Sequence, residues 1–436
     1  MEIVTTAPTR RSRHAVLPIA SGVVLAAFLL TGCAAGSAGG GSTPTAFTYL
    51  SLTENTAVAD TLTTLSTGAC KTENAALPLK VTNQPQASID QQLQLLAGQN
   101  ALPVLFAAGN TPQLAKDLDK SGKLLNIADT LDDLGASDDL LSAASSTVTS
   151  LYGDTIALPT EFNIEGIWYN KQILGDNGID APTTWDELTD AAAKLKGAGV
   201  TPFSASGKEG WPITRLVGNY IFRSIGPDAL EKVAEGDAKL TDPDYVAAAQ
   251  AVADLGADGY FQDGVGSIDY DTALSEFTSG KAAFFYMGSW ALSAFNGDDN
   301  AIGAENVGFV PFPSVEGGAG DSTQLGANVG VPLAMSKAAY NDKVGAWLKC
   351  IADNYGATAL NDQGVLTGFT VNGEADVPPL TAEVQTQIDA ADQSVLWFEA
   401  LFSSEATTTS QTSAAQLVTG GVSAKDFMAA IQADLG

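Results

Sequence analysis

The chain has 436 residues, of which 45% are hydrophobic, with 21 Lys and Arg against 50 Asp and Glu, a single His and three Cys. This length suffices for two domain-sized cores, and the apolar fraction excludes a mostly disordered chain. The formal net charge of −29 argues against nucleic acid as a partner, because a polyanion would be repelled over most of the surface.

The first 32 residues have the features of a secretory signal peptide. Residues 10–13 are Arg-Arg-Ser-Arg, and the apolar run at residues 15–30 is too short for an ordinary membrane span. His14 lies inside this segment, so its cleavage would leave a chain without imidazole. Catalysis by His and metal sites with His ligands are then excluded, and we expect no metal site.

The four residues Leu30-Thr31-Gly32-Cys33 resemble the bacterial lipobox, in which the Cys is lipidated and becomes the new N-terminus. The alternative is a stray Cys at the end of an uncleaved anchor. Residues 33–44, rich in Gly, Ala and Ser, are predicted to be a flexible tether. We expect a lipid on Cys33 to hold the protein at the extracytoplasmic face of a bacterial membrane. Cleavage would remove three Arg and one Glu, which changes the net charge from −29 to −31.

The two other cysteines are Cys70 and Cys350. In an oxidising compartment, a pair of Cys without further ligands favours a disulfide over a metal or redox site. The alternative is two unpaired thiols that pack as small hydrophobes.

Predicted strands and helices alternate over residues 46–160. The predicted strands are 47–50, 77–82 and 103–107, and the predicted helices are 54–68 and a segment from Ser88 to Gly98. Residues 88–91, Ser-Ile-Asp-Gln, have the form of a capping box. Strand, helix and strand at this spacing predict a parallel, doubly wound sheet.

The alternation resumes after a break at residues 152–159. Strands are predicted at 164–169, at 200–203 and before Gly288, and a helix that starts with a capping box at Thr184 ends at Gly197. The last third is predicted to be mostly helical, with helices at 341–352 and from residue 423. Trp168 and Trp347 are predicted to pack in the core. We therefore expect an α/β protein with two doubly wound lobes, each with its own sheet.

Six segments carry a resemblance to a known family. In chain order they are LPTEFNIEGIWYNK from residue 158, PTTWDELTDAAAKLK from 182, GKAAFFYMGSWAL from 280, GANVGV from 326, AWLKCI from 346 and LVTGGVSAKDF from 417. Together they resemble the maltose-binding-like extracellular solute-binding proteins, family 1, of bacterial ABC importers. The resemblance covers essentially all of residues 45–436.

The resemblance implies an N-terminal lobe of residues 45–160 and 327–368 and a C-terminal lobe of residues 161–326 and 369–436, joined by crossover hinge segments. Cys70 and Cys350 would both lie in the N-terminal lobe, which favours their pairing. It further implies a monomer without cofactor or enzymatic activity. Such a protein captures a sugar, here expected to be an oligosaccharide, in the cleft between the lobes and delivers it to the ABC permease subunits.

A neutral sugar is bound by flat aromatic rings that stack on its C–H faces and by planar polar groups that pair with its hydroxyls. Trp290 matches the stacking Trp of the family's GSW motif, and Trp211 lies in a Gly-Trp-Pro turn. The polar candidates follow predicted strands or lie at crossovers. They are Asn163, Glu161, Glu54, Asn55, Asn110, Asn328 and Arg215.

Several of these assignments have alternatives. Asn163 matches a position where maltose-binding proteins carry a ligand-contacting carboxylate, and Glu161 is the neighbouring alternative. Asn and Glu side chains after strands also cap helices, and Arg215 could instead form a surface ion pair. A further stacking aromatic of the family is missing near Thr407, and two aromatic residues about ten positions earlier, 397 and 398, either line the cleft or pack in the core.

Two other functions stay open. The same fold could bind another small solute, but an amino acid ligand would want an Arg for its carboxylate, and only Arg215 and Arg223 lie beyond the predicted signal peptide. A secreted glycoside hydrolase needs two carboxylates and no His. Against it, Glu161 and Glu165 are the only pair at a strand end near the first family segment.

Overall fold

The computed structural model describes residues 44–53, 56–85, 88–109, 112–391 and 393–435. The predicted signal peptide and Cys33, together with the tether up to residue 43, lie outside these residues. Within the described part of the chain, no helix is long and apolar enough to cross a membrane.

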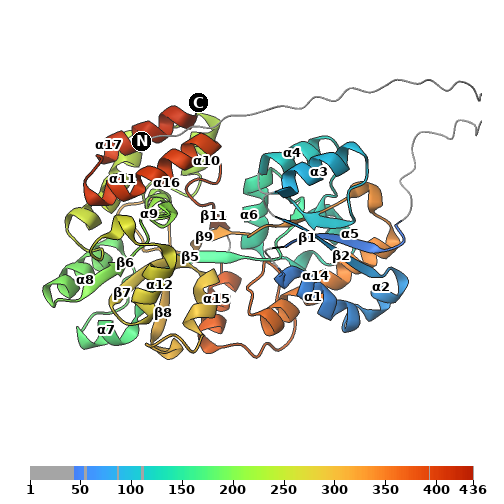
Figure 1. The fold of residues 1–436 in the computed structure, drawn as a ribbon, viewed down its shortest axis with the longest axis horizontal. Helices are drawn as coiled ribbons and strands as arrows, with labels where there is room; N and C mark the ends of the chain where they lie inside the picture. Colours follow the sequence, from blue (N-terminus) through green and yellow to red (C-terminus); the bar gives the residue numbers. More distant parts are fainter. Residues whose placement is uncertain (1–43, 54–55, 86–87, 110–111, 392, 436) are drawn as a thin grey trace, which may run out of the picture. The chain divides into compact units, whose positions relative to one another are not determined.

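Five strands form the first sheet (Figure 1). In order across the sheet they are β2 (Leu79–Gln84), β1 (Phe47–Leu52), β3 (Leu105–Ala107), β10 (Leu333–Met335) and β4 (Ala157–Leu158). The parallel pairing of β1 with β2 and β3 confirms the prediction. β10 runs antiparallel to both β3 and β4, so the sheet is mixed. A parallel neighbour needs a long crossover over its own sheet, whereas β10 enters directly from the second sheet.

Helices cover both faces of the first sheet, with α3 and α4 on one side of β1 and β2 and α1, α2 and α14 on the other (Figure 1). The helices of this part are α1 (Ala57–Thr67), α2 (Lys71–Ala76), α3 (Ile89–Gly98), α4 (Pro112–Lys120), α5 (Ile127–Asp133), α6 (Ser142–Tyr152) and α14 (Asp342–Gln363). Cys70, which precedes α2, forms a disulfide with Cys350 in α14, with a Cα–Cα distance of 5.8 Å. The bond therefore joins helices on one face of one sheet.

The second sheet has six strands. Its path is β11 (Gln393–Val395), β9 (Gln324–Asn328), β5 (Asn163–Asn170), β7 (Ala282–Gly288) and β6 (Thr201–Ser204), and β8 (Val307–Pro311) pairs with β5. This sheet is also mixed, because β5 runs antiparallel to β7, β8 and β9. Successive residues of β7 point into different cores, since Phe284 and Tyr286 belong to one buried cluster and Phe285 and Met287 to the other.

The helices around the second sheet are α7 (Lys171–Asp176), α8 (Trp185–Gly197), α9 (Trp211–Ser224), α10 (Ala229–Glu235), α11 (Pro243–Ala257), α12 (Tyr270–Thr278), α13 (Leu292–Phe295), α15 (Pro379–Asp389), α16 (Ser404–Thr419) and α17 (Ala424–Leu435). The predicted capping box of α8 is confirmed: Thr184 accepts from the Glu187 N–H, and the Glu187 carboxylate accepts from the Thr184 N–H. Trp168 and Trp347 are fully buried, as predicted.

The chain crosses between the sheets from β4 to β5, from β9 to β10, and between α14 and β11. The first and third crossovers run side by side, since the Phe162 N–H donates to Leu366 O and the Gly368 N–H donates to Pro159 O, both at 2.9 Å. β9 continues to Asn328, so the predicted lobe boundary after residue 326 falls inside a strand. The other lobe boundaries stay predictions.

One expectation about local structure was wrong and another was incomplete. Ser88 makes no side-chain cap for α3, because its hydroxyl donates to Pro85 O and accepts from the side chain of Gln84. The last third, although rich in helix, also contains the unpredicted strands β8, β9, β10 and β11, and these complete both sheets.

Candidate functional site

Three tryptophans surround the guanidinium group of Arg215. The Cζ atom of Arg215 lies 4.8 Å from the ring centre of Trp211 and 5.7 Å from those of both Trp290 and Trp397. These four residues line a cavity of about 360 Å³ together with Asn328, Gly330 and Gln411. The site thus combines aromatic faces with an amide-rich polar edge, and it draws on α9, α16 and the segments after β7, β9 and β11.

A tight turn before α9 places Trp211 and Arg215 one helical turn apart on the same side. Gly210 precedes the helix with a φ of +76°, and a Cβ at this position would lie only 1.9 Å from Gln411 O. Both facts require glycine at residue 210, which lets the backbone of α16 approach and bring Gln411 to the cavity.

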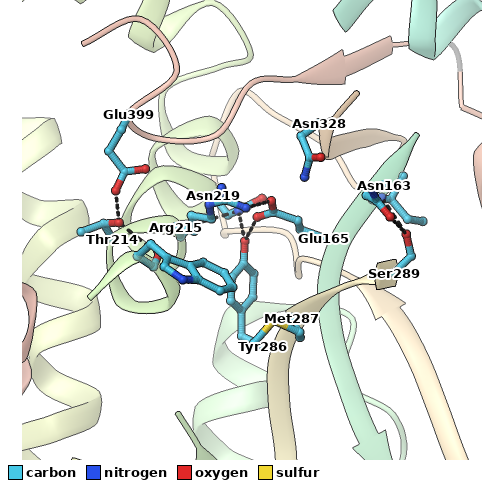
Figure 2. Close-up of polar contacts among 12 residues, drawn as sticks. Asn163, Glu165, Thr214, Arg215, Asn219, Tyr286, Met287, Ser289, Asn328 and Glu399 are labelled. Atoms are coloured by element: carbon cyan, nitrogen blue, oxygen red, sulfur yellow. Dashed lines mark hydrogen bonds and ion pairs between the residues drawn. The ribbon is translucent and has the colours of Figure 1, made fainter. Parts of the chain in front are cut away.

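A buried network of polar side chains holds Arg215 in place, as Figure 2 shows. One terminal nitrogen of Arg215 forms an ion pair with Glu165 Oε1, and the two side chains are 16% and 1% exposed. The Tyr286 O–H donates to Glu165 Oε2 at 2.5 Å, and the Asn219 amide donates to Tyr286 Oη at 2.7 Å. Burial, and next the charge of Glu165, raise the pKa of Tyr286 well above its ordinary value, so Tyr286 keeps its proton. The charge of Arg215 is therefore paired within the protein.

The other arginine beyond residue 13, Arg223, is not available to a ligand. It is fully buried, and it donates to Phe312 O and Gln324 O, each at 2.9 Å. Burial lowers the pKa of Arg223 to about 10, which still leaves it charged at neutral pH. Arg223 thus holds together the two ends of the loop between β8 and β9.

The crossover after β9 presents Asn328 to the cavity. Asn328 lines the cavity, and its Oδ1 accepts from the Gly330 N–H at 3.2 Å, so this hydrogen bond does not use its amide NH₂. Gly330 has a φ of +56°, and a Cβ there would lie 2.2 Å from Glu161 Oε2. Glu161 therefore packs behind the cavity wall at Gly330. Asn163 pairs with Asn328 across β5 and β9 but accepts from the Ser289 hydroxyl at 3.2 Å and does not line the cavity.

The structure thus brings four of the predicted site residues together in one cavity, namely Trp211, Trp290, Asn328 and Arg215. Glu54, Asn55 and Asn110 lie outside the described residues. Of the two aromatic residues left open, Trp397 lines the cavity and Phe398 is buried in the core.

Sequence reasoning missed Gln411. Gln411 lies in α16, a helix of mostly small and polar residues. Its position beside buried Ser410 and three residues before buried Ala414 is the only local sign that it differs from the exposed polar residues of this helix.

Other hollows fit a sugar less well. Cavities of about 410 and 500 Å³ lie beside β1 and beside α8, and among the described residues neither is lined by an aromatic side chain. In the same part of the chain, no group of three or more His, Cys, Asp or Glu residues is placed to hold a metal ion.

Comparisons with known proteins identify the family of the chain. Residues 79–358 match the family described as bacterial extracellular solute-binding protein. A multiple sugar-binding protein of Streptococcus mutans is 27% identical over 39% of this chain and 41% of its own length. A probable sugar-binding periplasmic protein of Rhizobium meliloti is 27% identical over 67% of this chain and 69% of its own length. The chain thus spans less than half of the first of these relatives.

Solved structures match over a larger part of the chain. A structure described as a chitin oligosaccharide binding protein is 26% identical, with a TM-score of 0.69, over 89% of this chain and 98% of that protein. This likeness confirms the expected α/β fold with two sheets. Because the family match covers well over half of the residues, the chain belongs to the bacterial extracellular solute-binding proteins, a family of binding proteins and not of enzymes.

Proposed function

We propose that the protein captures a neutral saccharide against Trp211, Trp290 and Trp397 and delivers it to the permease of an ABC importer. The observation that carries this proposal is the cavity itself, in which three indole faces meet a guanidinium group and two amide side chains. Indole faces suit the C–H faces of a sugar ring, and amides both donate to and accept from hydroxyls.

The charges around the cavity favour a neutral ligand. Glu165 already neutralises Arg215, and Arg223 is buried among backbone carbonyls. An amino acid or an acidic sugar would need a free cation for its carboxylate. The sugar-binding names of the similar proteins from Streptococcus mutans and Rhizobium meliloti support the same class of ligand. A volume of about 360 Å³ suits one or two sugar rings in direct contact, so a longer oligosaccharide would extend beyond the tryptophans.

Calorimetry against a panel of neutral and acidic mono- and oligosaccharides, with amino acids as a comparison, tests the proposal. We expect one group of related neutral sugars to bind. In the Trp290→Ala variant their affinity should fall by about tenfold or more, because a buried stacking surface is lost. Trp185→Phe is the matched control, since Trp185 packs on Phe312 and Tyr220 and does not line the cavity. Binding of amino acids alone, or equal affinities of Trp290→Ala and the wild type, would contradict the proposal.

We further propose that a lipid on Cys33 anchors the protein to the outer face of the cell membrane and that residues 33–44 act as its tether. The signal-peptide pattern before Cys33 supports this part of the proposal. Mass spectrometry of the protein extracted from membranes of the native host should find a chain that begins at Cys33 and carries a lipid. A membrane-bound chain that still contains residues 1–32 and no lipid would refute the anchor.

A further inference from the structure

The segment that carries Trp397 is held against α9 at three neighbouring points. The Trp397 ring faces Arg215, and Phe398 packs so closely on Gly218 that a Cβ there would lie 2.9 Å from Phe398 Cβ. Glu399 then contacts the hydroxyl of Thr214, which lies one helical turn before Gly218 on the same side of α9. The position of the third indole therefore depends on how residues 398 and 399 fit this helix.

Glu399 is an unusual residue for this place, because its side chain is only 5% exposed. Its Oε1 atom contacts Thr214 Oγ and lies 3.5 Å from Ser410 Oγ. Its Oε2 atom is buried and has no hydrogen-bond partner among the residues that the structure describes. A buried carboxylate is costly unless it accepts several hydrogen bonds or pairs with a cation.

The hydroxyl hydrogens near Glu399 already have other acceptors. Thr214 Oγ is 3.1 Å from Trp211 O, and Ser410 Oγ is 2.8 Å from Thr407 O. Each hydroxyl has one hydrogen to donate. If Thr214 donates to Trp211 O, the hydrogen between Thr214 and Glu399 must come from the carboxyl group. In this arrangement Thr214 donates to Trp211 O, Ser410 donates to Thr407 O, and a protonated Glu399 donates to Thr214 Oγ.

The charged groups that face Glu399 are Arg215 on α9 and Glu165 on β5. Burial raises the pKa of Glu399 and outweighs the lowering by Thr214 and by Arg215, and Glu165 raises it further. Arg215 is also already paired with Glu165, while Tyr286, the remaining titratable neighbour, keeps its proton. The surroundings therefore favour a neutral side chain at residue 399.

We infer that Glu399 is a neutral carboxylic acid whose O–H donates to Thr214 Oγ and that this hydrogen bond positions Trp397 in the cavity. The consequence for sugar affinity rests on the proposed function, whereas the hydrogen bond itself does not. The neutral form persists at low pH and is lost as the pH rises through the raised pKa of Glu399. The buried carboxylate would then accept from the Thr214 hydroxyl but would have no free cation beside it in the described part of the chain, because Arg215 is paired with Glu165, so residues 397–399 would move from α9 and the indole would lose its place.

Fluorine NMR of fluorotryptophan-labelled protein tests the hydrogen bond without any ligand. The chain has six Trp residues, and the signal of Trp397 is the one missing in Trp397→Phe. We expect this signal to shift as the pH rises from acidic to alkaline in the wild type but not in Glu399→Gln, whose amide donates to Thr214 and does not titrate. Glu405→Gln, at an exposed position of α16, is the matched control and should titrate like the wild type.

A Trp397 signal that is independent of pH in the wild type, or one that shifts equally in Glu399→Gln, would overturn the inference. Affinity measurements for the best sugar of the panel form the second arm. Affinity should fall about tenfold in Glu399→Ala and in Thr214→Val, stay near the wild-type value in Glu399→Gln, and fall with rising pH only where residue 399 is Glu. If no sugar binds while the NMR result holds, the proposed function fails and the positioning of Trp397 by Glu399 stands. A Glu399→Gln variant as weak as Glu399→Ala contradicts the role of a neutral acid.

Discussion

Replacing Arg215 by Met would leave Glu165 as a buried carboxylate without its cation. Glu165 is only 1% exposed, and its other partner is the neutral hydroxyl of Tyr286. Removing one partner of a buried ion pair costs about 3–5 kcal/mol. Because the Tyr286 hydrogen bond remains and Arg215 is itself 16% exposed, we expect a loss near the lower end, about 3 kcal/mol, in the free energy of unfolding.

The double variant Arg215→Met/Glu165→Gln should recover most of this loss. Glutamine at residue 165 keeps an oxygen for the Tyr286 hydroxyl and carries no charge, so burial no longer demands a cation. Contacts of the guanidinium group with three indole rings would still be missing, at about 0.5–1 kcal/mol for such a contact at a partly exposed site. We expect a coupling energy between the two substitutions of about 2 kcal/mol.

Urea denaturation followed by circular dichroism measures all four proteins of this cycle. The interpretation of Arg215 as the cation of a buried pair fails if Arg215→Met costs less than about 1 kcal/mol. It fails equally if adding Glu165→Gln lowers stability further, because the two substitutions would then act independently.

Three further predictions concern the scaffold. Thr184→Ala removes the side-chain cap of α8, a hydrogen bond of 3.2 Å, and should lower the free energy of unfolding by about 1 kcal/mol in urea denaturation; an unchanged value would argue against the cap. Gly256→Ala places a Cβ only 1.8 Å from Val418 O and should cost about 1–3 kcal/mol or more, whereas Gly197→Ala, with nothing within 4 Å, should cost nothing. Cys70→Ser opens a disulfide with a sequence separation of 280 and should lower the melting temperature to that of the reduced wild type; a melting temperature insensitive to reductant would contradict this.

Elements with a clear local pattern were predictable from the sequence. β1, Phe-Thr-Tyr-Leu-Ser-Leu, is rich in strand-forming residues. α8 has an apolar stripe and a complete capping box, and these local signals need no partner from elsewhere in the chain. The short strands β10 and β11 have three residues each, too few for a periodicity to show. They form because the neighbouring strands offer unpaired backbone edges, and this depends on the tertiary fold.

The same distinction applies to the site. Trp211 was predictable because it follows Gly210 in a turn, and Trp290 because it follows Gly288-Ser289 at a strand end and matches the GSW motif. Nothing around Glu399 marks it as a buried acid, since its contact with Thr214 joins residues 185 positions apart. Arg215 and Glu165 are 50 positions apart, so their pairing also depends on the tertiary fold, and the sequence could not distinguish a surface ion pair from a buried one.

Helix α9 carries a different contact on each successive turn, from Trp211 at its start through Arg215 and Gly218 to Arg223 near its end. A helix advances about 100° per residue, so one inserted residue in its middle would rotate the second half away from its partners. A single substitution in α9 can therefore change one of these contacts and leave the others intact. An insertion or deletion in α9 would break several of them at once. Among proteins that use this arrangement for other ligands, we expect insertions and deletions to accumulate in loops that do not contact α9 and to be absent from the helix itself.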